Sequence, residues 1–472
     1  MPKLDRNAGD FRAAGHRLID WAADYLENVD RYDVLSRSVP GSIENALPQH
    51  PRAEGRSYDE IVADFESTIV PGVTHWNHPA FFAYFSITGS QAGILAELLI
   101  AALNANGMLW KTSPSLTELE SLTLRWLREA LGLPEGLFGI INDTASINSF
   151  LALAAAREAL GLGIRKEGMT GRDLPPLRVY CSEHAHSSIE KGALALGFGQ
   201  SGVVEIATDE QHRMRIDALE AAIANDRAAG ALPCCVVATT GTTSIASVDP
   251  VPEIAAIAER EKMWLHVDGA YAGSATIVPE LRWIWNGVEK ADSIVVNPHK
   301  WLFVPIDCSV LYTRKPDVLR ETFSLVPEYL KTTDSAEVNY MDYGLQLGRR
   351  FRALKLWFVF EHYGLERMRA VIRDHVAMAA RLAEELLKRD DIELLAPQMF
   401  SVVVFRKLVR DANGDVDEAA SERVTTDALE RMNASGRLFV SHTKLRGQYG
   451  IRVAIGNGAT EWEHVARVLE YL

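Results

Sequence analysis

The chain has 472 residues, 47% of them hydrophobic, and carries a formal net charge of -14. This length and apolar content are sufficient for a large core and indicate more than one domain. The acidic balance, without a long basic run, disfavours nucleic acid and anionic membrane surfaces as partners. The expected kind of function is therefore chemistry on a small molecule.

The sequence shows no targeting signal and no membrane span. Charges are spread through residues 1–26, where a signal peptide needs an uninterrupted apolar stretch. The longest apolar stretch, residues 92–110, is interrupted by Glu97, Asn104 and Asn106. We therefore expect a buried helix there and no transmembrane segment.

The cysteines predict neither a metal site nor a disulfide framework. None of their spacings is typical of either, and all four lie in or beside apolar strand-like runs. We expect them to be small core residues of a cytoplasmic protein. They are Cys181, Cys234, Cys235 and Cys308.

The chain is predicted to divide into three parts. Residues 1–88 are helical in pattern, interrupted by prolines and too few for a core of their own, so we expect them to pack on another surface, such as that of a second subunit. Residues 89–353 form the large domain. Residues 354–472 combine helical stretches with the strand-like segments FSVVVFRK and YGIRVAIGN, which indicates a smaller α+β domain.

The large domain alternates short apolar runs with amphipathic helical stretches. Seven such runs predict an α/β fold with a seven-stranded, mostly parallel sheet that is covered on both faces. In such a sheet, ligands bind beyond the carboxyl ends of the strands. The runs are residues 137–142, 177–182, 203–208, 234–240, 263–268, 293–297 and 308–313.

The turn after the first run contains Thr144, Ala145 and Ser146 at the start of a predicted helix. Free backbone N–H groups and a hydroxyl at a helix start suit a phosphate group. Taken alone, however, this pattern is more typical of a helix cap. A second hydroxyl-rich turn, residues 238–244, follows another run.

Polar residues also follow later runs. Asp268 ends one run and is followed by the small residues Gly269 and Ala270, which let a ligand approach the backbone. A buried carboxylate needs a partner, so Asp268 is either a ligand contact or part of a cap or salt bridge. His266 shares its face and is either a core histidine or a functional one.

Two histidines, His184 and His186, follow the second run, and each taken singly is expected to be structural. Lys300 lies between a histidine and a tryptophan, one βαβ step after Asp268. A buried ammonium is costly unless it is paired or neutralised. Lys300 therefore either extends to the surface or is held for chemistry.

These groups together describe a site for pyridoxal 5′-phosphate. A lysine amine can form a Schiff base with the cofactor, and a carboxylate keeps the pyridine nitrogen protonated. A flat imidazole such as that of His186 can stack on the cofactor ring. The turn at Thr144 supplies the phosphate cradle.

Five segments strongly resemble the pyridoxal-phosphate-dependent group II decarboxylases, in particular the aromatic-L-amino-acid decarboxylases. The resemblance covers nearly the whole chain and implies the type I, aspartate aminotransferase-like PLP-dependent transferase fold. It also implies a homodimer with active sites at the subunit interface, in which the N-terminal segment wraps around the partner. The segments are residues 73–85, 112–120, 264–275, 295–312 and 347–360.

The resemblance implies a role for each candidate residue. Lys300 is the Schiff-base lysine, Asp268 pairs with the pyridine nitrogen and His186 stacks on the ring. Tyr329 matches a loop tyrosine that reaches the neighbouring subunit's site and governs protonation after CO2 leaves. The phosphate contacts are Ala145, Ser146 and Asn297, while Thr243, Ala270 and His299 line the cofactor.

The predicted substrate is an aromatic L-amino acid: tryptophan, phenylalanine, tyrosine or dopa. If they line the pocket, four apolar and aromatic residues disfavour a substrate with a carboxylate on its side chain. They are Trp76, Phe82, Tyr84 and Phe85. The segment AYFSIT has Ile87 where the family usually has a threonine, and Met108 stands where an aromatic residue is usual. These changes favour an apolar aromatic substrate, and Gly348 matches a position where plant relatives with glycine tend to take indolic substrates.

Four rival functions are considered. The closest is an aromatic acetaldehyde synthase, in which oxygen attack yields an aldehyde, ammonia and peroxide. Relatives of that kind tend to lack either the loop tyrosine or the stacking histidine, whereas Tyr329 and His186 are both present here. The others are a decarboxylase for a non-aromatic amino acid, a transaminase, and a catalytically silent scaffold that binds the cofactor.

Overall fold

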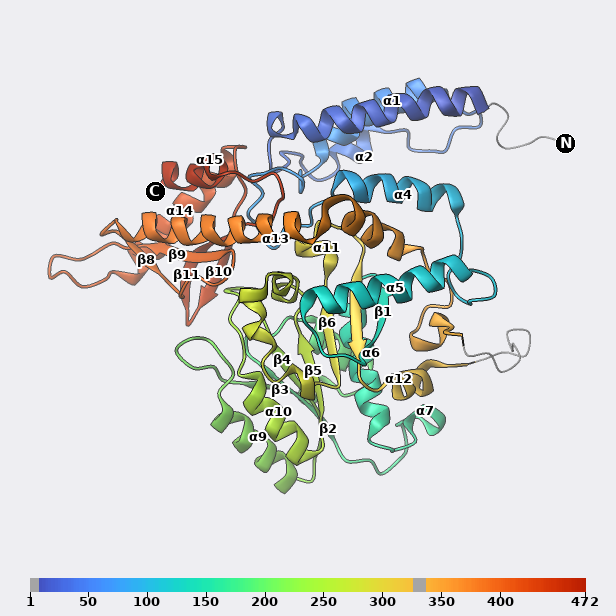
Figure 1. Ribbon diagram of the computed structural model, residues 1–472. Helices are drawn as coiled ribbons and strands as arrows, with labels where there is room; N and C mark the ends of the chain where they lie inside the picture. The colour runs from blue at the N-terminus through green and yellow to red at the C-terminus, as the bar shows by residue number, and fades with distance from the viewer. Residues whose placement is uncertain (1–7, 326–336) are drawn as a thin grey trace.

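The computed structural model describes residues 8–325 and 337–472, and these residues form two β-sheets (Figure 1). All seven apolar runs predicted as strands form strands of the larger sheet, in the order β1-β7-β6-β5-β4-β2-β3. Only β7 runs antiparallel to its neighbours β1 and β6. The strands are β1 (Phe138–Asn142), β2 (Leu177–Ser182), β3 (Val203–Ile206), β4 (Leu232–Thr239), β5 (Trp264–Asp268), β6 (Ser293–Val296) and β7 (Ser309–Thr313).

Helices surround this sheet, as the alternation of apolar runs and amphipathic stretches predicts. The α/β fold with a seven-stranded, mostly parallel sheet is confirmed. The helices between residues 91 and 323 are α4 (Gln91–Leu103), α5 (Pro114–Leu131), α6 (Ala145–Ala159), α7 (Ile164–Glu167), α8 (Ser188–Ala195), α9 (Ile216–Ala228), α10 (Val251–Glu261), α11 (Pro298–Trp301) and α12 (Pro316–Phe323).

The C-terminal region builds a second, four-stranded antiparallel sheet in the order β10-β11-β9-β8. The long helix α13 lies above the small sheet in Figure 1 and extends towards α4 and α5. It is interrupted at Gly364, whose φ is 67°. The elements are α13 (Arg352–Leu387), β8 (Ile392–Leu394), β9 (Val402–Lys407), α14 (Glu418–Ala434), β10 (Ser441–Leu445), β11 (Gln448–Ala454) and α15 (Trp462–Ala466).

The N-terminal helices are α1 (Ala8–Glu27), α2 (Ser42–Ala46) and α3 (Tyr58–Asp64). Helix α1 lies along the top of the molecule in Figure 1, away from the large sheet. Residues 80–83, in contrast, are fully buried in the core of the small sheet. The backbone N–H of Phe82 donates to the carbonyl of Phe439 at 2.8 Å. This contact ties the end of the N-terminal segment to the C-terminal region.

Across the described ranges, no helix is both long and apolar enough to span a bilayer. The stretch expected as a buried helix forms α4, which is buried along one side only. Its other side carries exposed leucines.

Candidate active site

The carboxyl ends of all strands except the antiparallel β7 meet at one edge of the large sheet. Thr239 at the end of β4 pairs with Asp268 at the end of β5, and Asp268 pairs with Val295 in β6. β2 runs parallel to β4, and β1 runs in the same direction as β6 because both are antiparallel to β7. The polar residues after these strands therefore lie at the same edge, where open α/β sheets bind ligands.

Lys300 lies in the short helix α11, which begins at Pro298 directly after β6. Its Nζ is 5.1 Å from the centre of the Phe85 ring. Burial lowers the pKa of Lys300, whereas the nearby Asp268 carboxylate opposes that shift. The Lys300 amine therefore lies inside the site, beside Phe85, and does not extend freely to the surface.

Asp268 is only 6% exposed. Its Oδ1 accepts the backbone N–H of Ala270 at 3.0 Å, and the carbonyl of Ala270 accepts the N–H of Asn297 at 3.3 Å. Asp268 is therefore fixed at the strand end by the small-residue turn that follows it.

His186 follows β2 and is oriented by Ser188. Its Nδ1 accepts the backbone N–H of Ser188 at 3.2 Å and lies 2.9 Å from the Ser188 hydroxyl. Because Nδ1 is an acceptor, the neutral ring carries its proton on Nε2. Partial burial lowers the pKa of His186, Asp268 opposes this shift and Lys300 adds to it. The charges at the ends of β5 and β6 thus act on this ring.

The turn after β1 caps a helix and also presents the start of that helix, as the sequence predicted. The Thr144 hydroxyl caps α6 by accepting the N–H of Ile147 at 3.5 Å, and Ala145 and Ser146 open the helix. A helix start of this kind also offers backbone N–H groups to an anion.

A buried chain of polar side chains connects this turn to Asn297. Asn142 donates to Asn148 at 2.7 Å, Asn148 donates to Ser309 at 2.7 Å, and Ser309 donates to Asn297 at 2.5 Å. All four residues are at most 5% exposed. The chain fixes the positions of β1, α6, β7 and the residue before α11 relative to one another.

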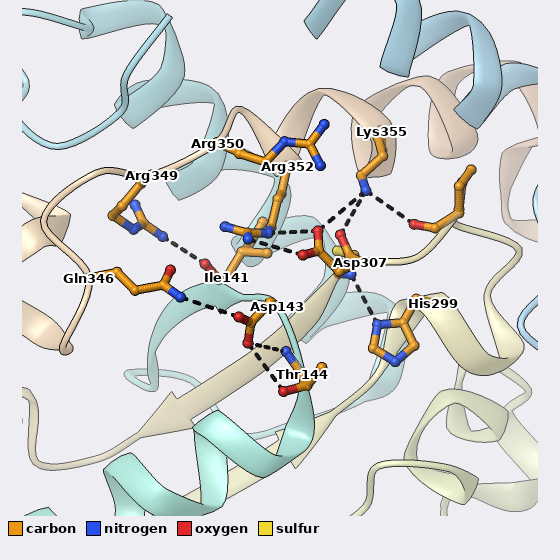
Figure 2. A network of polar contacts seen from close by, with 12 residues as sticks. Ile141, Asp143, Thr144, His299, Asp307, Gln346, Arg349, Arg350, Arg352 and Lys355 are labelled. Carbon is orange, nitrogen blue, oxygen red and sulfur yellow. Dashed lines mark hydrogen bonds and ion pairs between the residues drawn. The ribbon is translucent and has the colours of Figure 1, made fainter. Parts of the chain in front are cut away.

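His299 is held by a network around Asp307, which Figure 2 shows from close by. Arg352 donates to both carboxylate oxygens of Asp307 at 2.9 and 3.1 Å, and Lys355 donates to its backbone carbonyl at 2.7 Å. The next residue, Cys308, donates its N–H to Nδ1 of His299 at 3.0 Å.

Burial lowers the pKa of His299 to about 3, and the charge of Lys300 acts in the same direction. The ring is therefore neutral at physiological pH. Since Nδ1 accepts the N–H of Cys308, the ring proton lies on Nε2.

Arg452 in β11 is a site residue that the sequence analysis missed. Its Nε donates to the carbonyls of Thr243 and Ser244, each at 3.0 Å, and its Nη1 donates to the carbonyl of Tyr84. Its Cζ lies 4.6 Å from the centre of the Phe85 ring, the same ring that Lys300 approaches. The signal was a single arginine inside the apolar run YGIRVAIGN.

The predicted pocket residues fall into two groups. In the first group, the ring of Phe85 contacts Lys300. Tyr84, the residue before Phe85, stacks on Trp76 with ring centres 5.9 Å apart. Ile87 follows on the same segment and is half-buried.

Met108 and Gly348 form the second group. The Asn106 side chain lies 3.7 Å from the Met108 sulfur and accepts the N–H of Arg349 at 2.9 Å. Within the described residues, no contact joins this group to Lys300. Tyr329 lies outside the described residues.

Two further histidines from the sequence analysis, His266 and His184, form contacts away from Lys300. His266 is fully buried, with Nδ1 2.8 Å from the Ser293 hydroxyl and Nε2 3.5 Å from that of Ser149. His184 contacts His212 at 3.1 Å, and it contributes nothing to the group around Lys300. For His266, the core interpretation is therefore the one the structure supports.

Comparisons with known proteins agree with this geometry. A family model for the conserved domain of pyridoxal-dependent decarboxylases matches residues 40–408. Tyrosine decarboxylase 4 from Petroselinum crispum is 39% identical over 475 residues, covering 98% of this chain and 92% of that protein. Phenylacetaldehyde synthase from a Rosa hybrid cultivar is 38% identical over 471 residues, covering 97% and 92%. Among solved structures, Oryza sativa TDC with PLP and tryptamine superposes with a TM-score of 0.94 at 36% identity, covering 99% of this chain and 98% of that one.

Proposed function

The chain belongs to the pyridoxal-dependent decarboxylase family, and on that premise we propose that it converts an aromatic L-amino acid to the arylalkylamine and CO2. It is an enzyme, an amino-acid decarboxylase, and its cofactor is pyridoxal phosphate. The observation that carries the proposal is the aromatic ring of Phe85 beside the amine of Lys300. An aromatic wall next to the reactive amine suits a substrate with an aromatic side chain.

The residues at the sheet edge fit this cofactor. Lys300 supplies the amine of a half-buried side chain, and Asp268 supplies a carboxylate for the pyridine nitrogen. His186 offers a flat ring on which the cofactor stacks. The phosphate is assigned to Ala145 and Ser146 at the start of α6, together with Asn297, while Thr243 and Ala270 line the ring and His299 lies beside the cofactor.

Bound in this site, pyridoxal phosphate supplies an electron-poor ring that accepts the electron pair left behind by the departing carboxylate. Asp268 keeps the pyridine nitrogen protonated, which maintains that electron demand. Lys300 would bind the cofactor between turnovers, and the substrate amine would replace the lysine amine when substrate binds. His186 and Phe85 would confine the reacting group, and Tyr329 is assigned the protonation of the carbon from which CO2 leaves.

The substrate preference is proposed to lie with apolar aromatic amino acids, tryptophan above all. Ile87 presents a hydrocarbon side chain on the segment next to Phe85, so a catechol or phenol finds no hydroxyl partner at that position. Met108 and Gly348, which lie apart from Lys300 in the single chain, are proposed to line the same pocket. Tyrosine and dopa remain within the substrate class.

We propose a homodimer with active sites at the subunit interface. Two features support it. Helix α4 exposes Leu95, Leu98, Leu99 and Leu103, which are between 44% and 61% exposed, and apolar patches of this kind mark interfaces. The Met108 and Gly348 group also lies apart from Lys300, which suits a pocket completed by the second copy.

We also propose the division into domains at residues 88 and 353. In this proposal the helices of residues 1–88 pack on the partner subunit, while residues 80–83 belong to the core of the small sheet. Helix α1 exposes Phe11, Leu18 and Ile19, which are 68%, 42% and 41% exposed. A cytoplasmic location is proposed because all four cysteines are buried and free.

A product assay tests this function directly. The protein is loaded with cofactor and offered tryptophan, phenylalanine, tyrosine and dopa with and without oxygen. Amine and CO2 in equal amounts, independent of oxygen, are expected. No CO2 from any of the four would contradict the proposal and would direct the search to non-aromatic amino acids.

The second candidate is an aromatic acetaldehyde synthase, because a phenylacetaldehyde synthase is among the 38% identical relatives. It is distinguished in the same assay by aldehyde, ammonia and peroxide that appear only with oxygen. His186 at the cofactor ring, together with Tyr329 in the sequence, favours the simple decarboxylase.

A further inference from the structure

Among the described residues, Arg452 is a buried cation that has no carboxylate partner. It is 3% exposed, and its described contacts are to carbonyl oxygens and to the Phe85 ring. Its Nη2 is buried and has no hydrogen-bond partner in residues 8–325 and 337–472. A buried charge is costly unless it is paired, so a cation held this way needs a functional explanation.

The other buried arginine of the small sheet shows the contrast. Arg406 in β9 is 4% exposed, but its guanidinium pairs with Glu393 at 2.7 Å and also contacts Glu418. The same sheet therefore contains one arginine neutralised by carboxylates and one, Arg452, held by neutral groups.

The contacts of Arg452 join three parts of the chain around the site. From β11 it reaches the turn at Thr243 and Ser244, and it also reaches the segment of Tyr84. Tyr84 has a φ of 53°, a left-handed conformation that costs a non-glycine residue about 1 kcal/mol. The bond from Arg452 stabilises this conformation, which sets the direction of Phe85.

Arg452 and Lys300 share a neighbour, the aromatic ring of Phe85. Both cations lie over the ring of Phe85, at 4.6 and 5.1 Å from its centre. The ring cannot be displaced easily because its other contact is a stack on Tyr271, with centres 3.6 Å apart.

Two charged groups on the surrounding elements change the pKa of Lys300, and the charge of Lys300 in turn lowers the pKa of two nearby histidines. Asp268 on β5 raises the pKa of Lys300, and Arg452 on β11 adds to the lowering by burial. His186 after β2 and His299 beside it respond to the Lys300 charge. Arg452 itself stays charged at neutral pH, because burial lowers its pKa only to about 10.

We propose that Arg452 is a positioning residue that places a fixed, unneutralised positive charge beside Lys300 and so keeps the Lys300 amine in its uncharged, nucleophilic form. This inference rests on the proposed role of Lys300. Only the uncharged amine has the free electron pair that forms a C=N bond to the cofactor aldehyde, whose oxygen leaves as water. The same guanidinium fixes the aromatic wall and the turn that line the site.

The test is the pH profile of covalent cofactor attachment. Full-length protein is freed of cofactor and reloaded with pyridoxal phosphate at pH values from 6 to 10, and the band of the C=N bond is followed over time. Arg452→Met removes the charge, and the midpoint of the profile is expected to rise by about one pH unit. Arg452→Gln is a second neutral variant that still donates to carbonyls, in case the methionine variant does not fold.

Two further variants separate charge from structure. Arg452→Lys keeps the positive charge but loses the several N–H donors of the guanidinium group. Its midpoint should stay near that of the wild type, whereas the cofactor should dissociate several-fold faster. Arg406→Met is the matched control, because it removes an equally buried arginine of the same sheet without changing the midpoint.

Three results would overturn the inference. The first is a pH midpoint in both Arg452→Met and Arg452→Gln that equals that of the wild type. The second is an equal shift of the midpoint in Arg406→Met. The third is a raised KM for amino acids in the Arg452 variants with an unchanged midpoint. The last would assign Arg452 to a substrate anion instead. If wild-type protein forms no C=N band at any pH, the proposed role of Lys300 fails, and that result is distinct from all three.

Discussion

The indole Nε1 of Trp301 donates to Nδ1 of His375 at 3.0 Å, directly after Lys300 in the chain. The other ring nitrogen, Nε2, donates to the carbonyl of Asn457 at 2.9 Å. The ring of His375 therefore holds α11 against α13 only while Nδ1 is free of a proton. Burial lowers the pKa of His375 from 6.5 to about 4.

This relationship predicts a loss of stability in mild acid. Below about pH 6.5 the unfolded chain binds a proton at His375 that the folded chain does not take up until about pH 4. The free energy of unfolding therefore falls as the pH drops through this window, and the full contribution is present above it. Urea unfolding at several pH values measures the slope.

The variant His375→Gln removes this proton and should flatten the slope by up to about 1.4 kcal/mol per pH unit. His50→Gln, on an exposed residue, is the control and should leave the slope unchanged. An unchanged slope in His375→Gln would show that protonation of this ring is not coupled to folding.

Ser188 is predicted to orient His186 for the cofactor. Ser188→Ala removes the hydroxyl 2.9 Å from Nδ1 and leaves the backbone N–H bond in place. Loss of one neutral hydrogen bond of about 1 kcal/mol should weaken cofactor binding about fivefold. Equilibrium titration with pyridoxal phosphate measures this, and the neighbouring Ser187→Ala should bind as the wild type does.

The Asp307 network in Figure 2 is predicted to stabilise the protein. Arg352→Met removes the two bonds to the Asp307 carboxylate, although Lys355 remains 3.8 Å from it. We expect a loss of about 2 kcal/mol, below the usual cost of a broken buried pair because Lys355 compensates in part.

Urea unfolding of cofactor-free protein measures the effect. Arg350→Met is the matched control, since the Arg350 side chain is 51% exposed and its pair with Glu97 should contribute less than about 1 kcal/mol. Equal losses in both variants would argue against a special role for Asp307.

The exposed side of α4 is predicted to be the subunit interface. Leu98, 50% exposed in the single chain, would become buried between two copies. Leu98→Glu should weaken dimerisation at least about tenfold, because a carboxylate would be transferred out of water. Sedimentation velocity measures the assembly state. Leu387→Glu, on a leucine 61% exposed at the end of α13, should remain dimeric.

Much of the fold followed from local pattern. Each of the seven strands is an apolar run closed by polar or small residues, and Lys300 and Asp268 were recognisable because charged residues stand at the ends of such runs. The phosphate turn at Thr144 was ambiguous in sequence because capping and anion binding use the same residues.

The contacts of Arg452 could not be predicted in the same way. They join β11 to Tyr84 and to Thr243, positions far apart in the chain that only tertiary packing brings together. The arrangement of the predicted pocket could not be read from the sequence for the same reason. The family resemblance assigned Met108, Gly348 and Phe85 to one pocket, but within the single chain Met108 and Gly348 lie in a group apart from Phe85.

The most direct test of the account is to locate the cofactor. Full-length protein loaded with pyridoxal phosphate is reduced with borohydride, digested, and its peptides are weighed. We expect the added mass on the peptide that contains Lys300, and no added mass or visible band in Lys300→Ala. Attachment at another lysine, or a full visible band in Lys300→Ala, would contradict the site proposed at the carboxyl edge of the large sheet.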